Sequence, residues 1–122
     1  MSVRRIVANI HSSKLEESEA FYTQFLGLKL AMDMQWILTF ASETNPTAQI
    51  SIVRSDDAGI SNPGITLSIE VSDTDMLYEK AKSLGYEITY DITNEPWGVR
   101  RFFVKDPNGV TINVMAHIHP PA

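Results

Sequence analysis

The chain contains no cysteine among its 122 residues. This absence excludes disulfide bonds, thiolate metal ligands and a cysteine nucleophile. No hydrophobic run approaches the roughly 20 residues that a membrane-spanning helix needs, and the N-terminus lacks the hydrophobic core of a signal peptide. We therefore expect a soluble, cytoplasmic protein with no membrane partner.

Positive charge is scarce as well. Ten Lys and Arg residues face fifteen Asp and Glu residues, so the net charge is −5. Binding to a phosphate backbone needs a basic stripe, so no nucleic-acid partner is expected. No glycine-rich phosphate loop and no nucleophile arrangement is present either, and we assign no catalytic residue. Hydrophobic residues make up 43% of the chain, which suits a single domain over residues 1–122 with a core of its own.

The first half of the chain predicts a strand, a helix and two further strands. Residues 4–10 alternate Ile6, Ala8 and Ile10 with Arg5, Val7 and Asn9, which is the period of a strand with two unlike faces. Residues 13–28 carry apolar side chains at helical spacing, with Ser13 and Glu16 at capping-box spacing. Strands are expected around residues 35–41 and 49–53.

The second half repeats this plan. A strand over residues 64–71 and a helix from Ser72 lead to strands at 87–90, 100–104 and 110–115. The Leu-Gly pairs that end the two helices, at Gly27 and Gly85, lie 58 positions apart. We interpret the chain as two βαβββ units, over about residues 3–55 and 64–117, with a linker at 56–63. The alternative is a chance similarity of two strand–helix pieces.

The segments "LEESEAFYTQFLGL", "LYEKAKSLGYEI" and "EPWGVRRFFVKDPNGVTINV", in this order, resemble the vicinal oxygen chelate superfamily. That superfamily includes glyoxalase I, extradiol dioxygenases and bleomycin-resistance proteins. The resemblance implies an α+β fold in which two tandem βαβββ units form a curved, mixed β-sheet cup with the helices on its outer face. It also implies a ligand on the concave side and a homodimer.

The metal-dependent members carry His, Glu or Gln at four strand positions. By the resemblance these positions fall on Val7, Ser51, Thr66 and Asn113, none of which offers an imidazole or a carboxylate. Neutral hydroxyls and amides are weak ligands for a divalent cation, so we expect no metal and no other cofactor. Asn113 then bonds a ligand or the cup wall. His117 and His119 have ligand-like spacing, but a solvated tail explains them as well.

A cup without metal ligands is expected to hold an organic molecule through neutral polar groups and aromatic walls. Trp97 and Arg100 resemble a "WGxR" element of bleomycin- and mitomycin-binding relatives. Arg100 has three readings: an ion pair with Glu70 or Asp91, stacking on Trp97, or contact with an anionic ligand group. Arg101 is expected to face solvent. The ligand-binding candidates are Asn9, Trp36, Gln49, Ser51, Thr66, Ser68, Glu70, Trp97, Arg100, Asn113 and Met115.

These features favour a metal-free protein that binds a small organic molecule, of the antibiotic-sequestering type, over an enzyme. Two alternatives stay open. One is a glyoxalase-like lyase, an isomerase or a dioxygenase. The other is a dimeric module without catalytic activity.

Overall fold

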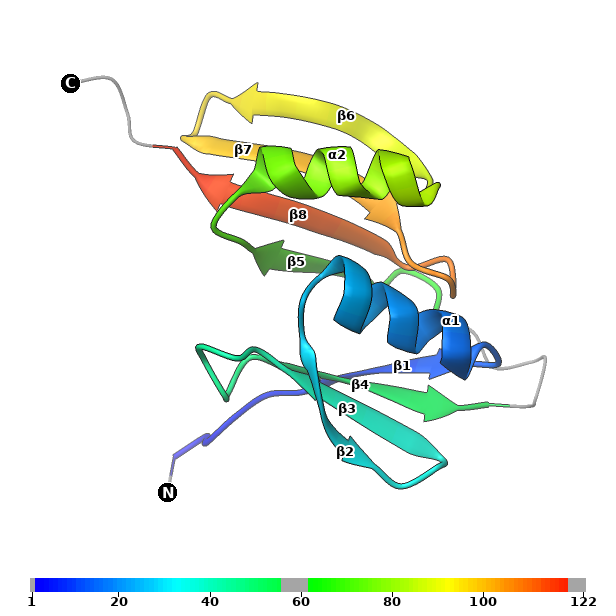
Figure 1. Ribbon diagram of the computed structural model, residues 1–122. Helices are drawn as coiled ribbons and strands as arrows, with labels where there is room; N and C mark the ends of the chain where they lie inside the picture. Colours follow the sequence, from blue (N-terminus) through cyan, green and yellow to red (C-terminus); the bar gives the residue numbers. More distant parts are fainter. Residues whose placement is uncertain (1, 56–61, 119–122) are drawn as a thin grey trace. The chain divides into compact units, whose positions relative to one another are not determined.

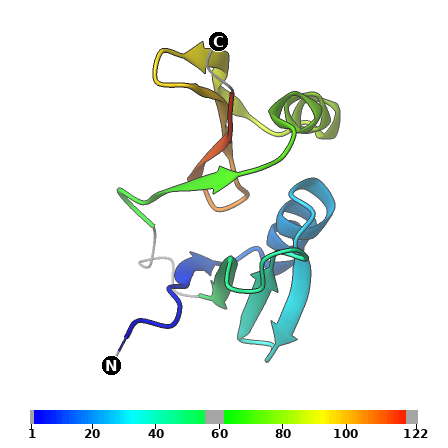
Figure 2. The same ribbon diagram turned by 90° about the vertical axis from the view of Figure 1, so that its left-hand side faces the viewer.

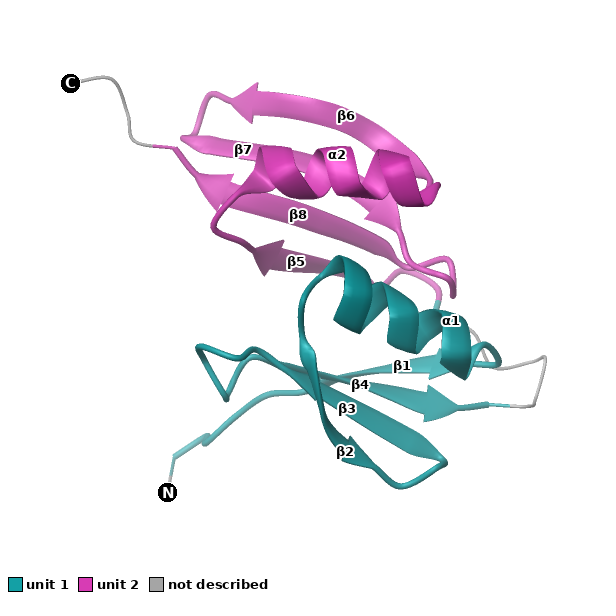
Figure 3. Ribbon diagram, in the orientation of Figure 1, with its two compact units in different colours: residues 1–62 teal, residues 63–122 magenta. Residues whose placement is uncertain are grey.

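The computed structural model describes residues 2–55 and 62–118. The chain divides into two compact units, residues 1–62 and 63–122 (Figure 3). Most of the expected linker, residues 56–61, lies outside the described residues. Each unit builds its own four-stranded mixed sheet and contributes one helical segment, so the predicted α+β fold of two repeated βαβββ units is confirmed.

The first unit has strand order β1-β4-β3-β2. Its first strand pairs with its last in parallel, and the remaining pairs are antiparallel. The helical segment begins as an α-helix and continues as π-helical turns. In chain order the elements are β1 (Ala8–Ser12), α1 (Leu15–Glu19), η1 (Ala20–Phe25), β2 (Lys29–Asp33), β3 (Ile37–Ala41) and β4 (Gln49–Arg54) (Figure 1).

Aromatic side chains of η1 make the core of this unit. Phe21, Tyr22 and Phe25 are fully buried, as their helical spacing predicts. The Tyr22 ring stacks on Phe40 of β3 with centroids 5.8 Å apart. Burial of each such side chain stabilises the fold by about 1.5–3 kcal/mol. The helix therefore fixes which face of the sheet is covered.

Three local expectations for this unit are corrected. The first strand starts at Ala8 rather than at residue 4, and Ile6 is 82% exposed ahead of it. The Ser13–Glu16 capping box does not form; instead the hydroxyl of Ser12 accepts a hydrogen bond from Lys14 N at 2.9 Å. A further strand, β2, follows the helix. Its five residues are all exposed, so it carries no buried alternation that would mark it in the sequence.

The second unit repeats the arrangement with strand order β5-β8-β7-β6. Its elements are β5 (Thr66–Glu70), α2 (Thr74–Leu84), β6 (Ile88–Glu95), β7 (Val99–Lys105) and β8 (Thr111–His117). Figure 2 views α2 nearly along its axis and shows that it covers one face of this sheet. Phe102, Val104, Ile112 and Val114 are buried in the sheet. The Tyr78 ring of α2 meets Phe102 edge-on at 5.3 Å.

The ends of α2 follow the expected signals, with one change of residue. Gly85 ends the helix at φ +80°, a left-handed conformation that suits glycine. The cap at the start is Asp73, whose carboxylate accepts a hydrogen bond from Met76 N at 3.0 Å, and not Ser72. Met76 and Leu84, expected on the apolar side, are exposed.

The Asp106-Pro107-Asn108-Gly109 turn joins β7 to β8. Asp106 is buried, and one oxygen of its carboxylate accepts hydrogen bonds from Asn108 N at 2.8 Å and Val110 N at 2.9 Å. Gly109 supplies the positive φ that the turn requires. The turn holds β7 and β8 in register and has a structural role.

Substitution of the α2 cap tests this local account. We expect Asp73→Ala to lower the free energy of unfolding by about 1 kcal/mol, because the Met76 amide loses its partner. Ser72→Ala is the matched control and is expected to change it by less than about 0.5 kcal/mol. Urea unfolding followed by circular dichroism measures both. Equal losses in the two variants would contradict the assignment of the cap.

Candidate functional site

The sheet of the second unit has one face that α2 does not cover, which we call the open face. Strand register decides which residues lie on it. Ser68 pairs with Asn113, which pairs with Phe103; in the next row Glu70 pairs with Met115, which pairs with Arg101. Because side chains alternate along a strand, these rows share one face. The candidates Thr66, Ser68, Glu70, Asn113 and Met115 therefore belong to the open face.

An arginine surrounded by aromatic rings lies on this face. The Cζ atom of Arg101 is 4.8 Å from the ring centroid of Phe103, 5.1 Å from that of Trp97 and 5.4 Å from that of Tyr90. Trp97 stands in the turn between β6 and β7, where Gly98 N bonds the carbonyl of Glu95 at 3.1 Å. This bend was expected from the sequence. Because of this bend, the indole ring of Trp97 lies against the guanidinium of Arg101.

One carboxylate completes this group. The side chain of Glu95 is 8% exposed, and its Oε2 lies 3.3 Å from Arg101 Nη2. Its Oε1 accepts a hydrogen bond from the Tyr90 hydroxyl at 2.8 Å. Both carboxylate oxygens are thus engaged by the protein itself. We call the five residues Tyr90, Glu95, Trp97, Arg101 and Phe103 the arginine–aromatic cluster.

Two polar atoms on the open face are buried without a hydrogen-bond partner among the described residues: Arg101 Nε and Asn113 Oδ1. The amide nitrogen of Asn113 does have one, since it donates to Ser68 Oγ at 3.0 Å. A buried polar atom without a partner costs about 1–3 kcal/mol. Such atoms are uncommon in folded proteins, and two of them on one face mark a place where a partner is missing.

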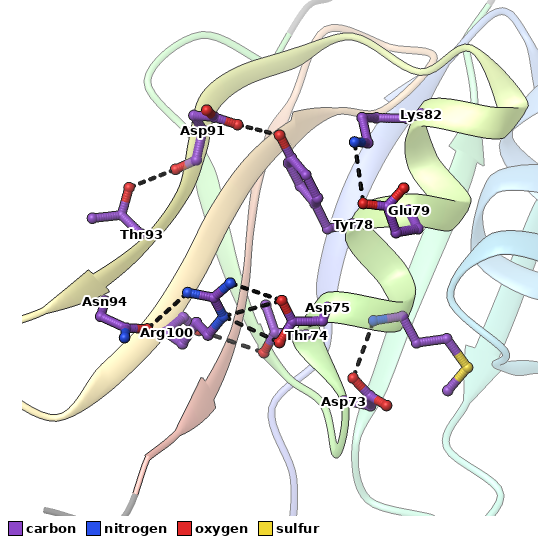
Figure 4. A network of polar contacts seen from close by, with 11 residues as sticks. Asp73, Thr74, Asp75, Tyr78, Glu79, Lys82, Asp91, Thr93, Asn94 and Arg100 are labelled. Carbon is purple, nitrogen blue, oxygen red and sulfur yellow. Dashed lines mark hydrogen bonds and ion pairs between the residues drawn. The ribbon is translucent and has the colours of Figure 1, made fainter.

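Of the three readings of Arg100, the structure shows an ion pair, although its partner is neither Glu70 nor Asp91. Arg100 lies on the face covered by α2 and binds both carboxylate oxygens of Asp75, with Nη2 at 2.7 Å from Oδ1 (Figure 4). It also donates to Asn94 Oδ1 at 2.9 Å. Arg101, expected in solvent, is half-buried on the open face. The sequence does contain a signal for the position of Arg101. Counting back along β7 from the turn at Asp106 pairs Arg101 with Met115, which lies on the open face.

The contacts of Arg100 hold α2 against the sheet. The hydrogen bond from Arg100 lowers the pKa of Asp75, and that same bond raises the pKa of Arg100. Farther along α2, the Tyr78 hydroxyl donates to Asp91 of β6, which lowers the pKa of Asp91 and raises that of Tyr78 (Figure 4). Asp91 therefore accepts a hydrogen bond from Tyr78, and Asp75 forms the ion pair with Arg100. These are structural bonds between helix and strand.

The sheet of the first unit carries a row of small polar residues on the face away from its helix. Asn9 pairs with Ser51, and Ser51 pairs with Thr39. The hydroxyls of Thr39 and Ser51 are buried and lie 2.8 Å apart, so each satisfies the other. Gln49, from the same strand, bonds Arg5 Nη1 and the carbonyl of Pro46.

Trp36 is not part of this row, because it lies ahead of the strand that was expected to begin at residue 35. Gln35 has a φ of +71°, and Met34 N bonds Ile37 O at 3.0 Å, so the chain turns here and β3 begins at Ile37. Leu38 and Phe40 are buried, and Phe40 packs against Tyr22 of η1. Trp36 lies in the turn and is 57% exposed.

The donor set does not fit a divalent metal. Register places Asn9 opposite Ser51 and Ser68 opposite Asn113, which offers only hydroxyls and amides. Within residues 2–55 and 62–118, no group of three or more His, Asp or Glu side chains is placed to hold an ion. Glu70 bonds His117 Nδ1 at 2.8 Å, and both side chains are exposed. His119 lies outside the described residues.

Comparison with known proteins gives the family. The model for the Glyoxalase/Bleomycin resistance protein/Dioxygenase superfamily matches residues 6–114. The chain therefore belongs to this superfamily, as its repeated units and turn sequences indicate. A search of curated proteins returned no match. In the part of the chain that the structure describes, no helix is long and apolar enough to cross a membrane.

Solved structures share the fold along nearly the whole chain. A superfamily member from Sphaerobacter thermophilus DSM 20745 is 24% identical with a TM-score of 0.80, over 96% of this chain and 99% of that one. A protein of unknown function from Agrobacterium tumefaciens str. C58 is 22% identical with a TM-score of 0.78, over 97% of both chains. A member from Alicyclobacillus acidocaldarius is 24% identical with a TM-score of 0.69, over 94% and 92%.

The structural role of Arg100 predicts a dependence on pH. The lowered pKa of Asp75 means that its ion pair stabilises the fold fully above the ordinary value of 3.8. This stabilisation is lost as the pH falls through the folded-state pKa. We expect Arg100→Gln to destabilise the protein at neutral pH, and its difference from the wild type to shrink below pH 3.8. Urea unfolding over a pH series, with NMR titration of Asp75, measures it. A difference independent of pH would contradict this role.

Proposed function

We propose that this protein is a metal-free, cytoplasmic binding protein that sequesters a small organic molecule of antibiotic-like kind on the open face of its second unit. The supporting observation is the arginine–aromatic cluster beside Asn113, with one buried donor atom and one buried acceptor atom lacking partners. Sites for organic ligands combine aromatic walls with a few placed polar groups. The open face has this composition, and its acids are bonded to Arg101, Tyr90 and His117 rather than grouped as ligands for an ion.

Binding rather than catalysis is favoured by the state of the acid in the cluster. Both oxygens of the Glu95 carboxylate already accept bonds from Arg101 and Tyr90. A general base must lie within hydrogen-bond reach of the substrate proton, and the Glu95 side chain is only 8% exposed. The other acid on this face, Glu70, bonds His117 in solvent. The cluster is thus better suited to hold a molecule than to deprotonate one.

Native mass spectrometry of the protein purified from the producing cell tests the proposal. We expect a retained organic molecule and no stoichiometric Ni, Zn, Mn or Fe by elemental analysis. Binding is then followed by fluorescence in a Trp36→Phe background, in which Trp97 is the sole tryptophan. A retained compound is expected to change the emission of Trp97, and Trp97→Phe with Trp36 intact to abolish that change.

Two results would overturn the proposed function. One is a tightly bound equivalent of metal, together with isomerisation of a glutathione hemithioacetal that a chelator abolishes. The other is the absence of any retained molecule combined with no response of Trp97 across bleomycin-type, mitomycin-type and simpler aromatic compounds.

We also propose that the protein forms a homodimer, and the edge strand β2 offers a surface for it. β2 is an outer strand of its sheet and is exposed along its length. β2 carries the exposed apolar side chains Leu30 and Met32 on either side of an irregularity in its register, and a second copy that covers this edge would remove them from water.

Sedimentation velocity tests this interface. We expect a dimer for the wild type and a shift to monomer for Leu30→Glu, because the interface would have to bury the new charge. Val3→Glu is the matched control, since Val3 is exposed in the same unit but lies outside β2. A dimer that tolerates Leu30→Glu would place the interface elsewhere.

A further inference from the structure

Resting on the proposed function, we infer the chemical class of the ligand: a planar, conjugated molecule that presents a carboxylate to Arg101 and a hydroxyl or N–H donor to Asn113. The inference comes from which hydrogen-bonding atoms of the open face are used by the protein and which are left over.

The carboxylate follows from a comparison of the two neighbouring arginines. Arg100 uses Nε, Nη1 and Nη2 to bind Asp75 and Asn94. Arg101 makes a single hydrogen bond, from Nη2 to Glu95 at 3.3 Å, and its Nε is buried without a partner among the described residues. A guanidinium has five N–H donors in a planar fork that matches a carboxylate. The partly used fork of Arg101 fits a second, planar acceptor group.

A cationic ligand is disfavoured by the same geometry. The faces of Tyr90, Trp97 and Phe103 that would receive an ammonium group already hold the Arg101 guanidinium at 4.8–5.4 Å. The one buried acid of the cluster, Glu95, is engaged by Arg101 and Tyr90. Within the cluster, a second cation would meet the positive charge of Arg101 and no carboxylate that the protein leaves unused. An anionic ligand would instead meet N–H donors of Arg101 that the described residues leave unused.

We infer that the ligand is planar from the aromatic walls of the site. Trp97 is 62% exposed, so its indole has free surface while it stays in contact with Arg101. A conjugated ring joined to the carboxylate would lie against this surface, and aromatic pairs of this kind add stabilisation beyond the area they bury. The carboxylate and the ring would then share the plane in which the guanidinium donors point.

The second polar group of the ligand follows from Asn113. Its amide nitrogen is used by Ser68, so the group still lacking a partner is the carbonyl oxygen, which accepts and cannot donate. Arg101 pairs with Met115, two residues along β8 from Asn113, which makes Arg101 and Asn113 diagonal neighbours. Such neighbours lie about 7–8 Å apart. One aromatic ring with the donor meta to the carboxylate can span this distance.

A set of four probes of similar size tests the class: benzoate, 3-hydroxybenzoate, 3-hydroxybenzamide and 3-hydroxybenzylamine. Each is titrated into the Trp36→Phe protein with Trp97 emission and calorimetry as readouts. We expect 3-hydroxybenzoate to bind about tenfold or more tightly than the neutral amide, which lacks the charge. It should bind about 3- to 10-fold more tightly than benzoate, which lacks the donor. The amine is expected to bind weakest.

Variants separate the two contacts. Arg101→Lys keeps the charge but loses the planar fork, and is expected to remove most of the preference for carboxylate over amide. Asn113→Ala is expected to remove the preference for 3-hydroxybenzoate over benzoate and to leave the carboxylate preference. Arg100→Lys, on the other face of the same strand, is the matched control and should preserve both preferences. Circular dichroism confirms that each variant is folded.

The outcomes distinguish this inference from the proposed function. Equal or tighter binding of the amine or the amide, or a cationic molecule retained from the producing cell, would overturn the ligand class while leaving an organic-binding protein. No binding of any probe would also overturn the ligand class. The failure of the proposed function is a different result, namely a resident metal or the lack of any retained or titratable organic molecule.

Discussion

The pairing of the first and last strands of each unit decides what every other residue can do. β1 lies parallel to β4, and β5 lies parallel to β8, in registers that bury apolar residues on one face. A slip by one residue would exchange the two faces of a strand, which the buried Ile and Val side chains forbid. The polar residues on the opposite face are therefore held as firmly as the core, although few of them contribute to it.

This constraint also explains how two adjacent arginines serve different purposes. Arg100 faces α2 and ties it to the sheet through Asp75, while Arg101 reaches the aromatic rings of the open face. One residue along a strand is enough to place one arginine against the helix and the next on the open face. The rigid side of β7 thus keeps the other side in place, and a site built on strands is positioned more accurately than one built on loops.

Much of the fold was predictable from the sequence, because apolar periodicity and turn residues are local signals. The buried aromatics of η1, the glycines that end both helices and the Asp106–Gly109 turn all behave as expected. β2 was missed because no face of it is buried. Trp36 was misplaced because Gln35 adopts a positive φ, and a glutamine in the sequence does not predict that conformation.

The site was harder to predict than the fold, since it depends on partners distant in the sequence. The positions of Ser68 and Asn113 on the open face follow from strand alternation. Asp75 binds Arg100, whereas Glu95 and three aromatic rings contact Arg101. These partners depend on how α2 and β6 pack on β7, and no local sequence pattern predicts them. The unsatisfied carbonyl of Asn113 is likewise visible only in three dimensions.

The parallel pairing of β5 with β8 also has a consequence for folding. Ser68 and Asn113 are 45 residues apart, yet they lie side by side in the finished sheet. The β6–β7–β8 meander can form from contacts that are close in sequence, whereas β5 must wait for β8 to be synthesised. Contacts of such long range slow folding. On the ribosome, each half of the chain can close only after its last strand has emerged, so the two halves are expected to mature one after the other.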